Sequence, residues 1–351
     1  MARLTPTRFL EIAKRFAQLE MALLGDVCLD RYFEIDPARR EVSIETGLEV
    51  RNVERVRCQP GAAGTILNNL AALGVGVLLP VGCCGEDGEG FELRRALAMR
   101  PGVRLDHFFG TPERTTFTYT KPLLMHPGRP PEELNRIDQK NWTPTPAGVE
   151  SRLRSSVRAL ADRAHAWIVM DQVDVPETGV VTRGVLEEVG RLARERPSRF
   201  IVADSRRGLA GFPPLSFKMN ASELARLLGV GPLESVDAIG REAARLASKN
   251  GRVVFVTLAE RGMVGAAPDG KWEHVPSHPI RGAIDIVGAG DAVTANLTAS
   301  VAAGATLREA MEVAQAAASI VIHQLGTTGT ASPSQIAALL SASSNCNKEH
   351  P

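Results

Sequence analysis

The sequence lacks the features that mark several large classes of protein. Its 351 residues carry 41 basic and 40 acidic side chains, and the resulting net charge of +1 is too small to attract nucleic acid or an anionic membrane surface. No run of about 18 apolar residues occurs, which argues against a membrane-spanning helix. Charged residues interrupt the first 19 positions, unlike the continuous apolar segment of a signal peptide. We therefore expect neither a nucleic-acid partner nor a membrane partner.

Cysteine pairs and common cofactor motifs are missing as well. The five cysteines are an odd number, and no two form the C-x-x-C spacing of zinc or redox sites, so we expect a reducing compartment, the cytoplasm. There is no Walker phosphate loop, and no dinucleotide fingerprint follows the first apolar run. His274 and His278 are four residues apart, but Pro276 prevents the helix that would direct both at one metal ion.

What is present is an alternation of helical and strand-like segments. The chain is long enough for one large α/β domain with an inserted piece. Strands that are separated by helices of 10–15 residues form parallel βαβ units. The predicted fold class is therefore α/β, with a doubly wound, mostly parallel sheet flanked by helices. The clearest expected strands lie at 167–170, 200–203 and 253–257, and the helices between them at 182–195, 221–228 and 236–248.

Two segments interrupt this alternation. Residues 31–59 are charged and rich in β-formers, and residues 115–120 alternate β-forming side chains. We expect the segments 31–59 and 108–141 to pair as a small β lid over the main sheet. The α/β domain then comprises 1–30, 60–107 and 142–340, and the polar tail at 341–351 is expected to be disordered.

The strongest local signal is D-I-V-G-A-G-D at 285–291, which leads directly into a small, apolar helix. Glycines let the backbone approach a ligand closely, and the free N–H groups of a helix's first turn bind anions. A carboxylate in such a turn fits a base that takes a proton from an attacking hydroxyl. The alternative is that Gly288 and Gly290 only shape a tight loop and that Asp291 is a helix cap.

This stretch resembles the C-terminal signature of the PfkB-type (ribokinase-like) carbohydrate kinases. The resemblance implies that Asp291 is the catalytic base and that the backbone of Gly288, Ala289 and Gly290 forms an anion hole. Other segments resemble the family in the same order from about residue 20 to residue 330. Together they imply a ribokinase-like fold, with the site at the carboxyl ends of the strands under the lid.

Three of these segments correspond to the family's acceptor site. They are G-D-V-C-L-D-R-Y at 25–32, P-G-A-A-G-T followed by N-N-L-A-A-L-G at 60–74, and N-R-I-D at 135–138. Ala62 and Thr65 stand where the family usually has glycine and asparagine. Each segment also has a structural reading: a turn cap, a helix cap or a surface salt bridge. The implied acceptor-binding residues are Asp30, Gly61, Ala62, Thr65, Asn69 and Arg136.

Two segments resemble the family's nucleotide site, N-A-S-E at 220–223 and V-T-L-A-E-R-G at 256–262. They imply that Asn220, Glu223, Thr257 and Gly262 lie beside ATP, and that Glu223 binds Mg²⁺ through water. Asn and Glu at this spacing also make an ordinary helix cap. The implied cofactors are ATP and Mg²⁺, with K⁺ as a further candidate.

The implied function is an ATP-dependent kinase that phosphorylates a hydroxyl of a sugar or sugar phosphate. Within the family, the leading helix, L-D-R-Y and N-R-I-D are most similar to heptose-phosphate kinases of the ADP-heptose pathway, and the resemblance also implies a homodimer through the lid. Three alternatives remain. They are a non-catalytic sensor of nucleotide or sugar with the same fold, a kinase acting on a nucleoside, and an α/β dehydrogenase that would bind NAD in preference to ATP.

Overall fold

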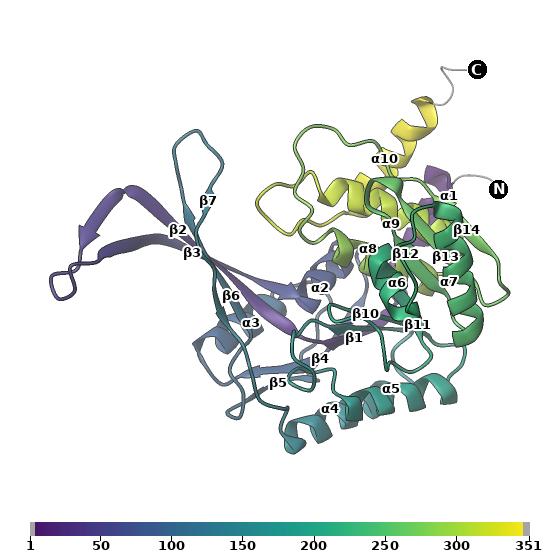
Figure 1. Ribbon diagram of the computed structural model, residues 1–351, viewed down its shortest axis with the longest axis horizontal. Helices are drawn as coiled ribbons and strands as arrows, with labels where there is room; N and C mark the ends of the chain where they lie inside the picture. Colours follow the sequence, from purple (N-terminus) through teal and green to yellow (C-terminus); the bar gives the residue numbers. More distant parts are fainter. Residues whose placement is uncertain (1–3, 347–351) are drawn as a thin grey trace.

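A nine-stranded sheet forms the centre of the computed structural model, which describes residues 4–346 (Figure 1). Its strands are β1 (Glu20–Gly25), β4 (Val77–Gly85), β5 (Phe108–Thr111), β9 (Ala166–Asp171), β10 (Phe200–Ser205), β11 (Ser216–Asn220), β12 (Val254–Thr257), β13 (Met263–Ala266) and β14 (Trp272–Val275). Their order is β14-β13-β12-β11-β10-β9-β1-β4-β5. Every neighbouring pair is parallel except β12–β13 and β13–β14.

Helices cover both faces of this sheet because its buried strands present apolar side chains on both sides. In β1, Met21 and Leu23 face one core, whereas Ala22 and Leu24 face the other. The first core includes α1 (Pro6–Ala13), α2 (Ala63–Ala72), α3 (Gly88–Ala98), α8 (Ala289–Ala302), α9 (Leu307–Val321) and α10 (Pro333–Cys346). The second includes α4 (Ala147–Leu160), α5 (Arg183–Glu195), α6 (Ala221–Leu228) and α7 (Val236–Asn250). Two short 3₁₀ turns, η1 (Phe16–Gln18) and η2 (Ala259–Arg261), complete the elements outside the smaller sheet.

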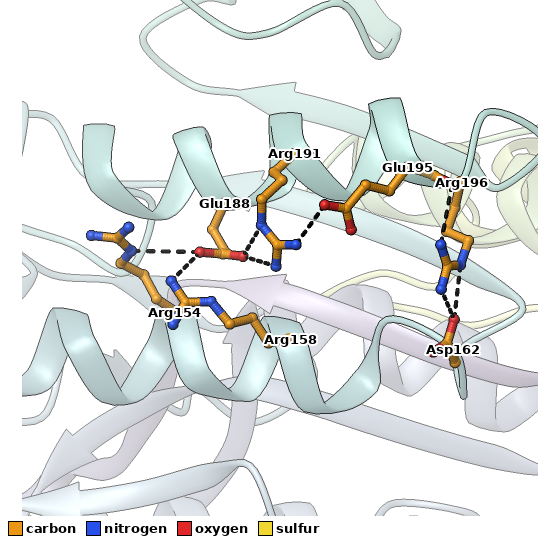
Figure 2. Close-up of polar contacts among 7 residues, drawn as sticks. All are labelled: Arg154, Arg158, Asp162, Glu188, Arg191, Glu195 and Arg196. Atoms are coloured by element: carbon orange, nitrogen blue, oxygen red, sulfur yellow. Dashed lines mark hydrogen bonds and ion pairs between the residues drawn. The ribbon is translucent and has the colours of Figure 1, made fainter.

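A buried carboxylate ties α4 to α5 on the outer surface of the second layer (Figure 2). The side chain of Glu188 on α5 is 2% exposed and accepts hydrogen bonds from Arg158 on α4, at 2.5 Å, and from Arg191. Arg154 lies 3.8 Å away on the same side. Three cations around one buried anion fix how these two helices pack.

A second sheet rises from the carboxyl end of the first and projects away from the body of the protein (Figure 1). Its strands are β2 (Val27–Val42), β3 (Glu49–Ala62), β6 (Thr118–Leu124), β7 (Glu132–Glu133) and β8 (Ile137–Gln139). Asp30 on β2 is in register with Gln59 on β3 and Tyr119 on β6, so these three side chains share one face of the sheet. We call this second sheet the lid.

The predicted doubly wound, mostly parallel sheet with a smaller second sheet is confirmed. The lid boundary at residue 108 was wrong, because β5 pairs with β4 in the main sheet and the lid is re-entered only at β6. The disordered tail was wrong for 341–346, which continue α10, and residues 347–351 lie outside the described part. In residues 4–346, no helix has both the length and the apolar character needed to span a membrane.

Candidate active site

The strand order of the main sheet reverses at β1. From β1 the chain adds β4 and β5 on one side, and later β9, β10, β11 and β12 on the other. In open α/β sheets, ligands bind outside the carboxyl ends of the strands at such a switch point. Here those ends carry acidic and amide groups: Asp26 after β1, Asp171 at the end of β9, Asp204 near the end of β10, and Asn220 at the end of β11.

Helix α8 begins at this edge of the sheet. Its N-cap, Gly288, has a φ of 83°, a left-handed conformation that glycine adopts without strain. The first N–H groups of α8 have no acceptor within the helix, and they carry the positive end of its dipole. The turn formed by Gly288, Ala289 and Gly290 therefore has the character of an anion hole.

Asp291, in the first turn of α8, has an ionisation suited to a base. Its pKa is raised to about 7, chiefly because its carboxyl is removed from water and in smaller part because of the carboxylates of Asp204 and Asp30, against the opposing effect of Lys218. Asp30 on the lid and Asp204 on the main sheet therefore both lie near enough to Asp291 to influence its charge. A carboxyl that titrates near neutral pH can accept a proton and release it again.

Lys218, on β11, was missed by the sequence reasoning. Its Nζ donates to Asp204 Oδ2 at 2.7 Å, and Thr294 Oγ1 on α8 donates to the same oxygen at 3.2 Å. Burial opposes the charge on Lys218, but the attraction of Asp204 and Asp291 outweighs it, and the pKa is raised. The same Nζ would lie 3.2 Å from a Cβ at Gly290, so a buried cation adjoins the turn at the start of α8.

The acceptor residues predicted on β2, β3 and α2 lie on the lid side of Asp291. A Cβ at Gly61 would come within 2.5 Å of Asp30 Oδ2, so the backbone there packs directly against the carboxylate. Ala62 has φ 53° and ψ −123°, a combination that only glycine adopts readily. Thr65 is buried, and its Cγ2 would lie 3.5 Å from a Cβ at Gly288. The starts of α2 and α8 therefore lie against each other on the lid side of Asp291.

Two predicted acceptor residues already have protein partners. Asn69 is fully buried, and its Nδ2 donates to the carbonyl oxygens of Thr65, at 3.0 Å, and Gly329, at 3.4 Å. Its amide nitrogen holds two backbone segments together, whereas its Oδ1 has no hydrogen-bond partner among residues 4–346, so the contact of Asn69 with the substrate stays a prediction. Arg136 binds Asp138 through Nε and Nη2, at 2.6 and 2.8 Å, and its guanidinium lies 4.2 Å from the ring centroid of Tyr119.

A cavity of about 600 Å³ lies on the other side of the α8 turn. Asn220, Thr257 and Gly262, which were predicted from two separate motifs, line this cavity together with Ala289 and Gly290. Its remaining wall is largely apolar, which suits a flat heteroaromatic base. The apolar side chains of this wall include Ile280, Ile284, Ile286, Val293, Ala318 and Ile322.

Asn220 and Glu223 form a capping box at the start of α6. Asn220 Oδ1 accepts from Glu223 N at 2.9 Å, and Glu223 Oε2 accepts from Asn220 N at 2.7 Å. This arrangement leaves the second carboxylate oxygen of Glu223 for a water molecule. Within residues 4–346, no cluster of three or more metal-binding side chains occurs. The donor set fits Mg²⁺ held mainly by phosphates and water, as that ion prefers, rather than by a cage of protein ligands.

Residues 215–335 match the model of the pfkB family carbohydrate kinase. The segment runs from β11 to the start of α10 and contains Lys218, the nucleotide motifs and the α8 turn. Among curated proteins, the "Bifunctional protein HldE" of Azorhizobium caulinodans is 33% identical over 309 residues, covering 88% of this chain and 61% of the relative. The protein of the same name from Gluconacetobacter diazotrophicus is 30% identical over 330 residues, covering 93% and 65%. The chain thus spans less than two thirds of these relatives.

Solved structures share the fold. Ribokinase from Arabidopsis thaliana, complexed with ribose and ATP, superposes with a TM-score of 0.66 at 21% identity, over 92% of this chain and 98% of that one. Phosphofructokinase-2 from Escherichia coli, in complex with potassium, superposes with a TM-score of 0.70 at 18% identity, over 93% and 99%. The expected ribokinase-like fold is therefore established across nearly the whole chain.

Proposed function

Because the chain carries a domain of the pfkB family of carbohydrate kinases in a ribokinase-like fold, we propose that it transfers the γ-phosphoryl group of ATP to a hydroxyl of a sugar or sugar phosphate. One observation carries the proposal. A carboxyl group with a pKa raised to about 7, Asp291, lies in the turn that separates the 600 Å³ cavity from the residues around Asp30. In this position, Asp291 can act as a base between a phosphoryl donor in the cavity and a hydroxyl acceptor near Asp30.

The roles of the residues follow from their places. The cavity beside Thr257 takes the adenosine part of ATP, which brings the phosphates to the start of α8. Asp291 takes the proton of the acceptor hydroxyl, and the Gly288–Gly290 turn stabilises the charge on the transferring group. Lys218 adds a positive charge beside that turn. Mg²⁺, when bound, neutralises the phosphates, and Glu223 orients its water.

We propose that the acceptor is a sugar phosphate, with a heptose phosphate as the first compound to test. Proteins named HldE are 30–33% identical to most of this chain, in line with the similarity of its L-D-R-Y and N-R-I-D segments to heptose-phosphate kinases. Positive charge on the lid supports an anionic acceptor. Lys121 lies close enough to Asp30 to lower the carboxyl's pKa, which burial raises, and its Nζ lies 5.2 Å from the ring centroid of Tyr32.

We further propose that the protein forms a homodimer through the lid and that K⁺ activates it. A homodimer through the lid would cover apolar side chains near the end of the β2–β3 arm, where Val42, Ile44 and Leu48 are 64%, 98% and 68% exposed. K⁺ is a candidate activator because the superposable phosphofructokinase-2 binds potassium. Light scattering would test the first, and an assay in K⁺ against Na⁺ the second.

A coupled assay of ADP release tests the main proposal. The parent protein, Asp291→Asn and the surface control Asp269→Asn are each given Mg-ATP and a panel of sugars, sugar phosphates and nucleosides. We expect release that depends on a sugar or sugar phosphate, a loss of about 10²–10⁴-fold in Asp291→Asn, and parent-like activity in the control. Release with nucleosides alone would make the chain a nucleoside kinase. ATP binding without release for any acceptor would favour the non-catalytic sensor.

A further inference from the structure

One hydrogen bond joins the lid to the C-terminal part of the main domain. The side chain of Gln59, on β3, donates from Nε2 to Thr328 Oγ1 at 2.8 Å, and the same nitrogen lies 3.2 Å from Tyr32 Oη. The two residues are 269 positions apart in the sequence. Gln59 is directly opposite Asp30 in the β2–β3 pairing, so the bond is made one strand away from the acceptor carboxylate.

Thr328 lies against the turn that precedes Asp291. A Cβ at Gly288 would be 3.4 Å from Thr328 Cβ, which is van der Waals contact. Thr328 belongs to the loop between α9 and α10, and this loop also binds the α8 turn through its backbone, because Gly326 N donates to Asp285 Oδ2 at 3.3 Å. The loop therefore contacts both halves of the proposed site.

Hydrogen bonds fix the conformation of this loop, so it can hold the lid and the α8 turn at a constant distance. Gln324 bridges it: its Nε2 donates to Thr330 O at 2.8 Å, and its Oε1 accepts from Thr330 N at 3.1 Å. Asn69 Nδ2 donates to Gly329 O at 3.4 Å from α2. A loop fixed at these points keeps the Thr328 hydroxyl in place when the tip of the lid moves.

We propose that Gln59 and Thr328 are positioning residues for phosphoryl transfer: their hydrogen bond sets the distance between the acceptor carboxylate Asp30 and the Gly288–Asp291 turn. The inference rests on the proposed function and goes beyond it, because neither residue belongs to the motifs that suggested the kinase. In-line transfer requires the acceptor hydroxyl and the phosphate to be held in register, and small misplacements lower the rate strongly. A fixed lid root also keeps water out of the site.

Four variants test the bond. Thr328→Val removes the hydroxyl at nearly constant shape, Gln59→Leu removes the amide, and the double variant removes both. Thr330→Val is the matched control, because it changes the same residue type in the same loop, and its hydroxyl has no hydrogen-bond partner in the described part of the chain. For each variant we would measure kcat and KM for the acceptor, KM for ATP, and ATP hydrolysis without acceptor.

We expect the effects of the two single substitutions on kcat/KM to be non-additive. Each single variant should lower kcat/KM for the acceptor by about three- to tenfold, the scale of one hydrogen bond, and the double variant should be no worse than the poorer single variant. ATP hydrolysis per phosphoryl transferred should rise, whereas KM for ATP and the control should stay at the parent value. Losses that multiply in the double variant, or an equal loss in Thr330→Val, would overturn the proposal.

Hydrogen exchange separates this inference from the kinase proposal, because it needs no acceptor. Thr328→Val should speed amide exchange both in β3 near Gln59 and in residues 285–290, while the control leaves both unchanged. If the parent transfers no phosphoryl group, the kinase proposal fails, and faster exchange in both segments would still support the link between lid and turn. Unchanged exchange in Thr328→Val refutes the link whatever the activity.

Discussion

Replacing Asp291 by asparagine should make the protein more stable while it removes the proposed base. Burial raises the pKa of this carboxyl from 3.8 to about 7, so at neutral pH and above the folded state holds an anion that it disfavours. Each pKa unit corresponds to about 1.4 kcal/mol, so the full penalty is at most ~4 kcal/mol. Asp291 is only partly buried, and screening by water reduces this figure to about 1–2 kcal/mol.

The sign of the pH dependence follows from proton binding. Between pH 3.8 and about 7, the folded state keeps the proton of Asp291 while the unfolded chain has lost it, so the free energy of unfolding falls as the pH rises. Asparagine cannot ionise and escapes this fall. The stability advantage of Asp291→Asn should therefore be small near pH 4, grow through pH 5–7 and be constant above about pH 8.

Thermal unfolding of both proteins at several pH values measures this difference without knowledge of the acceptor. A gain of about 1–2 kcal/mol should raise Tm by a few degrees at pH 8. The exposed control Asp269→Asn, whose carboxylate pairs with Lys271 and has a lowered pKa, should show no such gain. An advantage that does not change with pH, or a parent that is the more stable protein at pH 8, would refute the electrostatic description of the site.

Three further substitutions test the fold and the site. Ala62→Gly should raise the free energy of unfolding by about 1–2 kcal/mol, because φ 53° and ψ −123° strain any residue other than glycine. A lower free energy of unfolding for the variant, measured by urea denaturation, would contradict this. Lys218→Met should lower it by about 3–5 kcal/mol by leaving Asp204 buried without its cation, and should move the pH–rate profile of Asp291 to higher pH; an unchanged profile would mean that the lysine does not act on the base. Glu188→Ala should lower Tm by several degrees because three arginines then face one another, and an unchanged Tm would show that solvent screens them fully.

Sequence reasoning succeeded where the chemistry is local. The D-I-V-G-A-G-D turn and the helix it begins are contiguous, so the position of Asp291 at the start of α8 could be predicted from its neighbours in the chain. The lid boundary could not. The four residues Phe108–Thr111 form a strand in either interpretation, and only their pairing with β4, which is set by long-range packing, assigns them to the main sheet.

Lys218 was missed for a related reason. Its strand, β11, has only five residues and a lysine at its centre, which hides the apolar pattern of a buried strand. The signal was nevertheless available: a lysine flanked by Phe217 and Met219, two residues before the N-A-S-E motif, must be buried if that motif begins a helix at the sheet edge. A buried lysine needs a carboxylate, and Asp204 is at the end of the neighbouring strand.

Two departures of this chain from the motifs it resembles replace glycine at strained backbone positions. Ala62 stands where the family that the chain resembles usually has glycine, and so does Ala259 in the V-T-L-A-E-R-G segment at 256–262; both residues have a φ of 53°. The surrounding structure holds the strained backbone in place: Ala62 is paired with Val27, and the next residue, Ala63, donates its N–H to Asp26 O at 3.0 Å. The backbone therefore keeps the conformation that glycine favours, and each alanine adds a methyl group. Ala62 adds it beside the lid, and Ala259 adds it in the wall of the 600 Å³ cavity. Because the backbone path is preserved and the added methyl groups occupy space, we expect these changes to alter which ligands fit and to leave the role proposed for Asp291 unchanged.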